Sequence, residues 1–159
     1  MTRRLDGRHL LLLLMMAILG LSGCGQKGID LGGDRVGLRL PDGYMIKAEV
    51  ADTVAKRERG LSGWTNLAPN AGMWFVFEQP GEYPFWMPDM NFAIDIIWVG
   101  SNFNIVEIAN NVSPEPGVSR SQLKQYVNRY PALFVLEVPA GTAAAHKLGA
   151  GDKLEFISS

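Results

Sequence analysis

Cysteine and histidine are scarce in this chain of 159 residues. Cys24 is the single cysteine, so no disulfide can form within the chain. Of the two histidines, only His146 lies beyond the N-terminal segment considered below. A Ser-His-Asp or Cys-His catalytic site therefore has no well-placed histidine, and zinc lacks the thiolate and imidazole ligands that it prefers. No EF-hand or phosphate-binding glycine loop occurs either. We expect no metal and no cofactor.

The chain also lacks an excess of basic residues. Its 15 Lys and Arg residues face 16 Asp and Glu residues, for a net charge of −1. Without residues 1–23, which carry three of the basic and one of the acidic residues, 12 basic residues remain against 15 acidic ones. Proteins that bind nucleic acid rely on a basic surface that neutralises phosphates. We therefore expect no nucleic-acid partner.

No apolar run is long enough to span a membrane as a helix. The longest, Leu10–Leu21, is shorter than the roughly 20 residues that such a span requires. Three arginines precede it and small residues follow it, which is the pattern of an export signal. The four residues Leu21–Cys24 match the bacterial lipobox, in which the cysteine thiol receives a diacylglycerol before cleavage. We interpret residues 1–23 as a lipoprotein signal peptide and Cys24 as the lipidation site.

Lipidation would decide where the protein resides. Acyl chains on Cys24 would hold it on a membrane, because two or more chains give stable anchoring. We expect an extracytoplasmic position, on the periplasmic face, and the outer membrane where the cell has one, because Gly25 rather than Asp follows the cysteine. Residues 24–34 are rich in glycine and predict a flexible tether. Residues 35–159 then form one globular domain.

The domain is predicted to be mainly β. Alternating or continuous apolar patterns typical of strands occur in seven segments: Val36–Leu40, Tyr44–Val50, Met73–Phe77, Ile94–Val99, Ile105–Ala109, Leu133–Val138 and Leu154–Ile157. Many short strands separated by turns favour closure of the sheet. We expect a small closed or half-closed β-barrel-like domain, with a two-sheet β-sandwich as the alternative.

Two or three short helices complete the prediction. Thr53 can cap a two-turn helix that has basic residues in its last turn and ends at Gly60. Ser119 and Gln122 have the spacing of a capping box, and apolar residues at helical spacing follow them. A third helix is predicted over Thr142–Leu148, before a glycine.

Several motifs resemble the domain of unknown function 192 family of small bacterial and archaeal domains. They are Ala51-Asp52-Thr53 with Glu58-Arg59-Gly60-Leu61, Gly72 to Phe77, Phe85-Trp86-Met87 with Ile94-Asp95-Ile96, and Val135 to Thr142 with Gly151-Asp152. Their order and spacing cover residues 36–158. The resemblance implies a compact β-rich domain and supplies no reaction, substrate or cofactor.

The chain departs from the pattern of that family at two places. After the Gly-Leu pair at 60–61 the family usually shows a methionine and, two positions later, a basic residue, where this chain has Ser62 and Trp64. After Trp-Met at 86–87 the family shows Lys-Asn-Thr, where this chain has Pro88-Asp89-Met90. If the absent cations contact an anionic ligand in other members, that contact is lost or altered here.

Aromatic residues concentrate between positions 74 and 98, which hold eight of the 15 in the chain. Most of them are expected in the core. Phe85 and Trp86 are different, because they lie in a predicted loop where nothing requires two large rings to be buried. We predict a recognition cleft formed by Arg59, Phe85, Trp86, Met87, Asn91 and Asp95. The leading hypothesis is a non-catalytic binding or accessory module at the cell envelope, with an envelope protein or glycan as partner.

Asp95 lies within an apolar strand, where its carboxylate needs a partner. The structural interpretation is an ion pair with Arg59, or acceptance of loop N–H groups. The functional alternative is a hydrolase acting on a sugar or cell-wall polymer, with Asp95 and either Glu137 or Asp89 as acid and base. Such a pair must share one cleft at a separation of about 5 Å or about 6.5 to 9.5 Å. A third possibility is a structural domain that contacts only another envelope protein.

Overall fold

The computed structural model describes residues 33–157. The predicted signal peptide and Cys24, with nearly all of the tether over residues 24–34, lie outside the described residues. Within 33–157, no helix is both long enough and apolar enough to cross a membrane.

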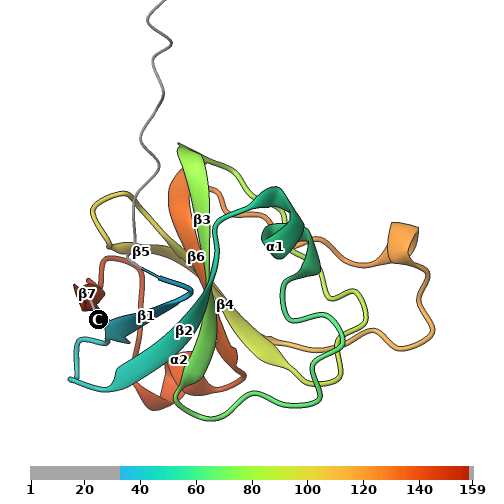
Figure 1. The fold of residues 1–159 in the computed structure, drawn as a ribbon, viewed down its shortest axis with the longest axis horizontal. Coiled ribbons are helices and arrows are strands. Elements are labelled where there is room, and N and C mark those ends of the chain that lie inside the picture. Colours follow the sequence, from blue (N-terminus) through green and yellow to red (C-terminus); the bar gives the residue numbers. More distant parts are fainter. Residues whose placement is uncertain (1–32, 158–159) are drawn as a thin grey trace, which may run out of the picture.

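The domain is built on one mixed sheet of seven strands (Figure 1). The strands are β1 (Arg35–Arg39), β2 (Met45–Ala51), β3 (Ala71–Gly81), β4 (Ile94–Val99), β5 (Ile105–Val112), β6 (Ala132–Pro139) and β7 (Glu155–Ile157). Their order in the sheet is β5-β4-β6-β3-β2-β1-β7. Strands β2 and β3 run parallel, and the other neighbouring pairs are antiparallel.

The sheet is curved but not closed. Its two edge strands, β5 and β7, form no ladder with each other in the described part of the chain. The segments that lead into them are joined by an isolated bridge between Asn104 and Lys153 and by backbone hydrogen bonds, such as that from the Ile105 N–H to the Asp152 carbonyl at 2.7 Å. The prediction of a mainly β, half-closed domain is therefore confirmed, and full closure of the barrel is not observed.

Each predicted strand segment overlaps an observed strand, with shifted ends. Strand β3 extends to Gly81 and β5 to Val112, both beyond the predicted limits. Both extensions pass irregularities in the pairing, between Val76 and Gly81 and between Ile94 and Ile96 of the neighbouring β4. Such bulges interrupt the apolar alternation on which strand prediction depends.

Two of the three predicted helices form. Helix α1 (Val54–Arg59) begins as expected, with Oγ1 of Thr53 accepting the backbone N–H of Lys56 at 3.2 Å. It ends at Gly60, whose φ of 49° is in the region that favours glycine. Helix α2 (Thr142–Ala145) is shorter than its predicted range.

The predicted helix after Ser119 is wrong. Only a single 3-10 turn, η1 (Arg120–Gln122), forms there. The Ser119 hydroxyl donates to the Gln122 side chain at 2.7 Å instead of capping a backbone N–H. Further along, Tyr126 exchanges two backbone hydrogen bonds of 2.8 Å with Phe85. That pairing requires extended backbone, so a tertiary contact overrides the helical pattern.

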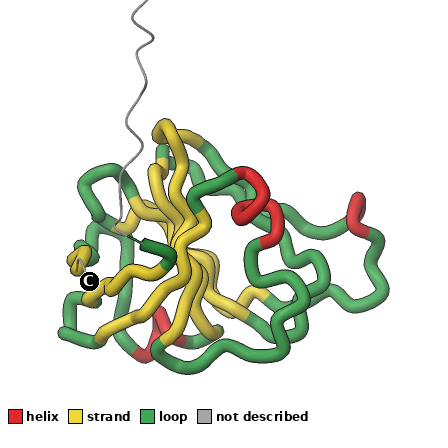
Figure 2. The backbone as a smooth tube through the Cα atoms, in the orientation of Figure 1, coloured by secondary structure: helices red, strands yellow, loops and turns green. Residues whose placement is uncertain are grey.

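Apolar side chains cover both faces of the sheet. One face, the first core, contains Trp74, Ile97 and Phe134. The other face, the second core, contains Phe75 and Trp98 with a further group of apolar residues. Helix α1 and the loops over residues 82–93 and 113–131 lie together on one side of the sheet in Figure 2. They cover the second core, and α1 and the first of these loops line the candidate site.

Candidate functional site

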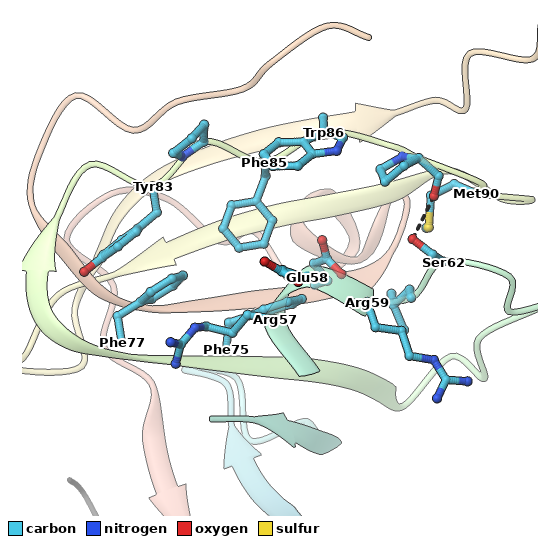
Figure 3. A pocket seen from close by; sticks show the side chains of 15 residues that line it. Arg57, Glu58, Arg59, Ser62, Phe75, Phe77, Tyr83, Phe85, Trp86 and Met90 are labelled. Atoms are coloured by element: carbon cyan, nitrogen blue, oxygen red, sulfur yellow. Dashed lines mark hydrogen bonds between the residues drawn. The ribbon is translucent and has the colours of Figure 1, made fainter. Parts of the chain in front are cut away.

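A cavity of about 180 Å³ opens between α1, the sheet and the loop that follows β3 (Figure 3). Residues 57–62 of α1 and its exit line one side, and residues 83–86, 88 and 90 of the loop line the other. Phe75 and Phe77 of β3 and Glu137 of β6 line it from the sheet. The cavity thus combines segments that are far apart in the sequence, on the face of the second core.

Interlocked aromatic rings form the wall of the cavity. Phe75 meets Phe85 edge-to-face at a centroid separation of 4.9 Å, and Phe77 stacks on Tyr83 at 3.5 Å. Phe85 is 9% exposed, whereas Trp86 is 36% exposed. Figure 3 shows the Trp86 indole on the loop next to Phe85. Such aromatic contacts hold the wall in shape, and Trp86 presents a ring to solvent at the edge.

The buried side chain of Asn128 holds the loop in place. Its Oδ1 accepts the backbone N–H of Tyr83 at 2.7 Å, and its Nδ2 donates to the carbonyls of Gly81 at 2.9 Å and Tyr130 at 2.6 Å. Together with the bridge between Phe85 and Tyr126, these bonds attach the wall to residues 126–130. Asn128 could not be recognised from the sequence, because it lies in the segment that was predicted to be helical.

Arg57 of α1 is fixed beside the aromatic wall. Its guanidinium donates to the carbonyls of Asp52 and Val76 at 2.9 and 2.7 Å and pairs with Glu78 at 3.0 Å. It also lies 5.3 Å from the centre of the Phe77 ring. A backbone hydrogen bond, and then the Arg57 guanidinium, lower the pKa of the Glu78 carboxyl. The charge of Arg57 is therefore balanced locally.

Glu137 differs from the other charged residues of the cavity because it is buried. In the pairing of β6 it stands opposite Met73 and Ile96, both members of the second core, so it faces the cavity side of the sheet. Its exposure is 5%, and burial raises the pKa of its carboxyl to about 8. Within residues 33–157 the carboxylate has no hydrogen bond and no ion pair. A buried acidic group without a partner thus lines an aromatic cavity.

The structure brings together three of the six residues predicted to form the cleft. Arg59, Phe85 and Trp86 all line the cavity. Met87 is only 2% exposed and packs in the second core beneath the loop. Asn91 donates from Nδ2 to the carbonyl of Trp64 at 2.7 Å, which fastens the loop rather than lining the cavity.

Asp95 lies on the opposite face of the sheet. It stands across from Val138 of the first core, and its carboxylate accepts the backbone N–H groups of Asn111 and Ala143, each at 2.8 Å. The predicted ion pair with Arg59 is therefore wrong. The carboxylate accepts backbone N–H groups, as the alternative expected, but these belong to β5 and to the first turn of α2 and not to loops. Asp95 takes no part in the cavity.

The predicted acid–base pairs of the hydrolase hypothesis are not assembled. Asp95 and Glu137 belong to neighbouring strands, but their side chains leave the sheet on opposite faces. Asp89 is exposed in the loop with a φ of 54°, and it lines a separate hollow near Glu115. Neither residue shares the cavity with Glu137.

Comparison with known proteins identifies the family. The family model DUF192, described as "Uncharacterized ACR", matches residues 39–156. A crystal structure from Sinorhizobium meliloti, described as a candidate transcription regulator, is 29% identical with a TM-score of 0.67 and covers 77% of this chain and 92% of its own. A protein of unknown function from Novosphingobium aromaticivorans is 31% identical with a TM-score of 0.67 and covers 76% of this chain and 83% of its own. No curated protein matches the chain. The chain belongs to the DUF192 family.

Proposed function

We propose that this protein is a lipid-anchored, non-catalytic binding module of the cell envelope, and that its ligand occupies the cavity between α1 and the 83–90 loop. One observation carries the proposal: a preformed concave site with aromatic walls and a few polar groups, which is typical of ligand-binding sites. Because about 180 Å³ is less than the roughly 300 to 1,000 Å³ of pockets for drug-sized ligands, the cavity suits a small ligand or one group of a larger partner.

The placement of the protein in this proposal comes from the sequence. The lipobox ending at Cys24 supports an acyl anchor, and Gly25 supports transfer to an outer membrane where one exists. A role in transcription, which the description gives for the Sinorhizobium protein, would require contact with DNA. The excess of acidic over basic residues after position 23 is unfavourable for contact with a nucleic-acid backbone.

A carboxylate-based hydrolase is the second candidate. One observation favours it: a buried carboxyl with its pKa raised to about 8 has the property of a general acid, and Glu58 of α1 lines the same cavity. The binding function is preferred because Glu58 is exposed and its side chain makes no hydrogen bond within residues 33–157. No contact in this part of the chain therefore holds the carboxyls of Glu58 and Glu137 at a catalytic distance. Loss of a measured release of sugar from cell-wall polymer in both Glu58→Gln and Glu137→Gln would favour hydrolysis.

Photocrosslinking in intact cells tests the binding function. A photoreactive residue at position 86 is expected to capture a specific envelope component, identified by mass spectrometry, because Trp86 lies at the edge of the cavity. The matched control is position 130, since Tyr130 is 59% exposed and lies outside the cavity lining. Excess purified chain should compete for the product at position 86. Equal capture at both positions, or no capture at position 86, would reject the cavity as the binding site.

A further inference from the structure

We propose that the cavity binds an organic ammonium group, with the Glu137 carboxylate as its counter-charge and the surrounding aromatic rings as its walls. This inference rests on the proposed binding function and names the chemical class of the ligand. The ligand would carry a primary ammonium on a short apolar body, because the cavity is small and mostly aromatic.

The carboxyl group of Glu137 has no partner in the described part of the protein. Glu137 is 5% exposed, lines the cavity, and has no hydrogen-bond partner within residues 33–157. Its neighbours across the sheet are the apolar side chains of Met73 and Ile96. An isolated buried carboxyl is costly unless a partner compensates it. Since the surrounding protein supplies no partner, a donor that enters through the cavity would fill this role.

None of the charged residues near Glu137 acts as the partner of its carboxylate. Arg57 is engaged by Glu78 and by two backbone carbonyls. Arg59 is exposed, and Figure 3 shows its guanidinium extending away from the aromatic rings. Glu58 contributes a further carboxylate from α1, and the loop contributes only the phenol of Tyr83 as a titratable group. Burial is the single cause of the raised pKa of Glu137, so neither arginine stabilises its carboxylate.

The aromatic walls of the cavity also favour a cation. Ring faces attract cations through their quadrupoles, and the attraction strengthens where water is excluded. This wall already holds one cation, because the Arg57 guanidinium lies 5.3 Å from the centre of the Phe77 ring. Phe75, Phe85 and Trp86 line the remaining space. Aromatic rings with a carboxylate form the usual environment for an alkylammonium group.

Binding of such a cation would release a proton. In the free protein the pKa of Glu137 is about 8, so the carboxyl is mostly protonated near neutral pH. A nearby ammonium favours the ionised form. The neutral carboxyl and the ammonium ligand would therefore give a carboxylate–ammonium pair and one proton delivered to the buffer. No covalent bond of the ligand forms or breaks.

Calorimetric titration of the full chain, purified in detergent, tests the inference with three probes of matched shape. Benzylamine is cationic near neutral pH, benzyl alcohol is neutral and benzoate is anionic. We expect benzylamine to bind at least tenfold more tightly than either control. Its affinity should rise about tenfold per pH unit up to about pH 7 and level off near pH 8, because only the ionised fraction of Glu137 binds it. Buffers of different ionisation enthalpy should report about one released proton per ligand near pH 7.

Variants separate the carboxylate from the rest of the cavity. Glu137→Gln should lose at least tenfold in affinity for benzylamine and the proton release, with its fold checked by near-ultraviolet circular dichroism. Glu155→Gln on β7, a carboxylate outside the cavity lining, is the matched control and should bind like the wild type. Equal or tighter binding of benzyl alcohol or benzoate, binding that weakens as the pH rises, or no binding of benzylamine would overturn the inference. Capture at position 86 would still support the proposed function in those cases.

Discussion

The carboxylate of Asp95 joins β4 to the first turn of α2. Its Oδ2 accepts the backbone N–H of Ala143 at 2.8 Å across 48 positions of sequence. Helix α2 has no capping side chain of its own at Gly141, so Asp95 satisfies one of the N–H groups that a helix start leaves free. Its Oδ1 accepts the N–H of Asn111, which has a φ of 51°. One buried residue thereby links the end of β5 and the start of α2 on the face opposite the cavity.

Replacing Asp95 by Asn should destabilise the domain. The amide retains one acceptor oxygen and directs its NH₂ group at a backbone N–H that then has no acceptor. Hydrogen bonds to charged groups contribute about 1.5 to 3 kcal/mol, so we expect a loss of roughly 3 kcal/mol and a melting temperature lower by about 10 °C. Thermal unfolding followed by circular dichroism measures this.

The control for that experiment is Asp89→Asn. Asp89 is exposed and its φ of 54° suits asparagine, so the same chemical change should leave the melting temperature within about 2 °C. An Asp95→Asn variant that melts at or above the wild-type temperature would reject the structural role of Asp95.

Gly60 ends α1 and lines the cavity, and alanine should be poorly tolerated there. Its φ of 49° and ψ of −138° form a combination that side chains avoid, although a new Cβ would meet Phe75 only at an ordinary 3.5 Å. The cost therefore arises from the backbone, at roughly 1 to 3 kcal/mol for Gly60→Ala. Urea unfolding gives the free energy.

Gly149→Ala is the comparison for Gly60→Ala. The φ of Gly149 is not positive, and its nearest contact for a new Cβ is Asp152 Oδ2 at 4.0 Å. The Gly149→Ala substitution should leave the free energy of unfolding unchanged or raise it by up to about 1 kcal/mol. Equal losses at the two glycines would show that the backbone at the end of α1 is not the cause.

The strands and α1 could be predicted because local patterns determine them. Thr53, the basic last turn and Gly60 mark α1, and apolar alternation marks β2. The segment after Ser119 could not be predicted in this way. Its helical spacing competes with the backbone pairing of Tyr126 and Phe85, which depends on two segments meeting in space.

The candidate site was predictable in part for a similar reason. Arg59, Phe85 and Trp86 stand out as polar or aromatic residues in exposed segments. The partners of Asp95, and the face of the sheet on which the Glu137 side chain lies, depend on strand register. A shift of one residue moves a side chain to the other face of the sheet. The local sequence does not indicate that the side chains of Asp95 and Glu137, on adjacent strands, point to opposite faces of the sheet.

Substitution of Cys24 by Ser tests the proposed anchor. A hydroxyl cannot replace the thiol as acyl acceptor, so Cys24→Ser should accumulate as an unlipidated precursor, measured by metabolic labelling with a fatty acid and by fractionation. Gln26→Ala, which leaves the lipobox intact, should be labelled and processed like the wild type. A labelled, mature, membrane-bound Cys24→Ser protein would reject lipidation at this site.

Glu137 should make the stability of the domain depend on pH. Burial raises the pKa of its carboxyl from an ordinary 4.5 to about 8, so between these values the folded state binds more protons at this site than the unfolded state does. Its contribution to the free energy of unfolding is therefore fully present below about pH 4.5 and decreases as the pH rises towards 8. Each pKa unit corresponds to about 1.4 kcal/mol, which gives a loss of roughly 4 kcal/mol from about pH 5 to about pH 8.

Urea unfolding of the wild type and Glu137→Gln at stepped pH isolates this contribution, because the other titrating groups are common to both proteins. We expect the wild type to lose stability relative to Glu137→Gln as the pH rises, since the neutral amide has no charge to desolvate. Glu155→Gln on β7 should show a flat difference from the wild type between about pH 6 and about pH 8, because an exposed carboxylate is ionised throughout that range in both states. A difference between wild type and Glu137→Gln that stays constant over the same range would mean that Glu137 is ionised in the folded protein. The proton release expected on binding of benzylamine would then not occur.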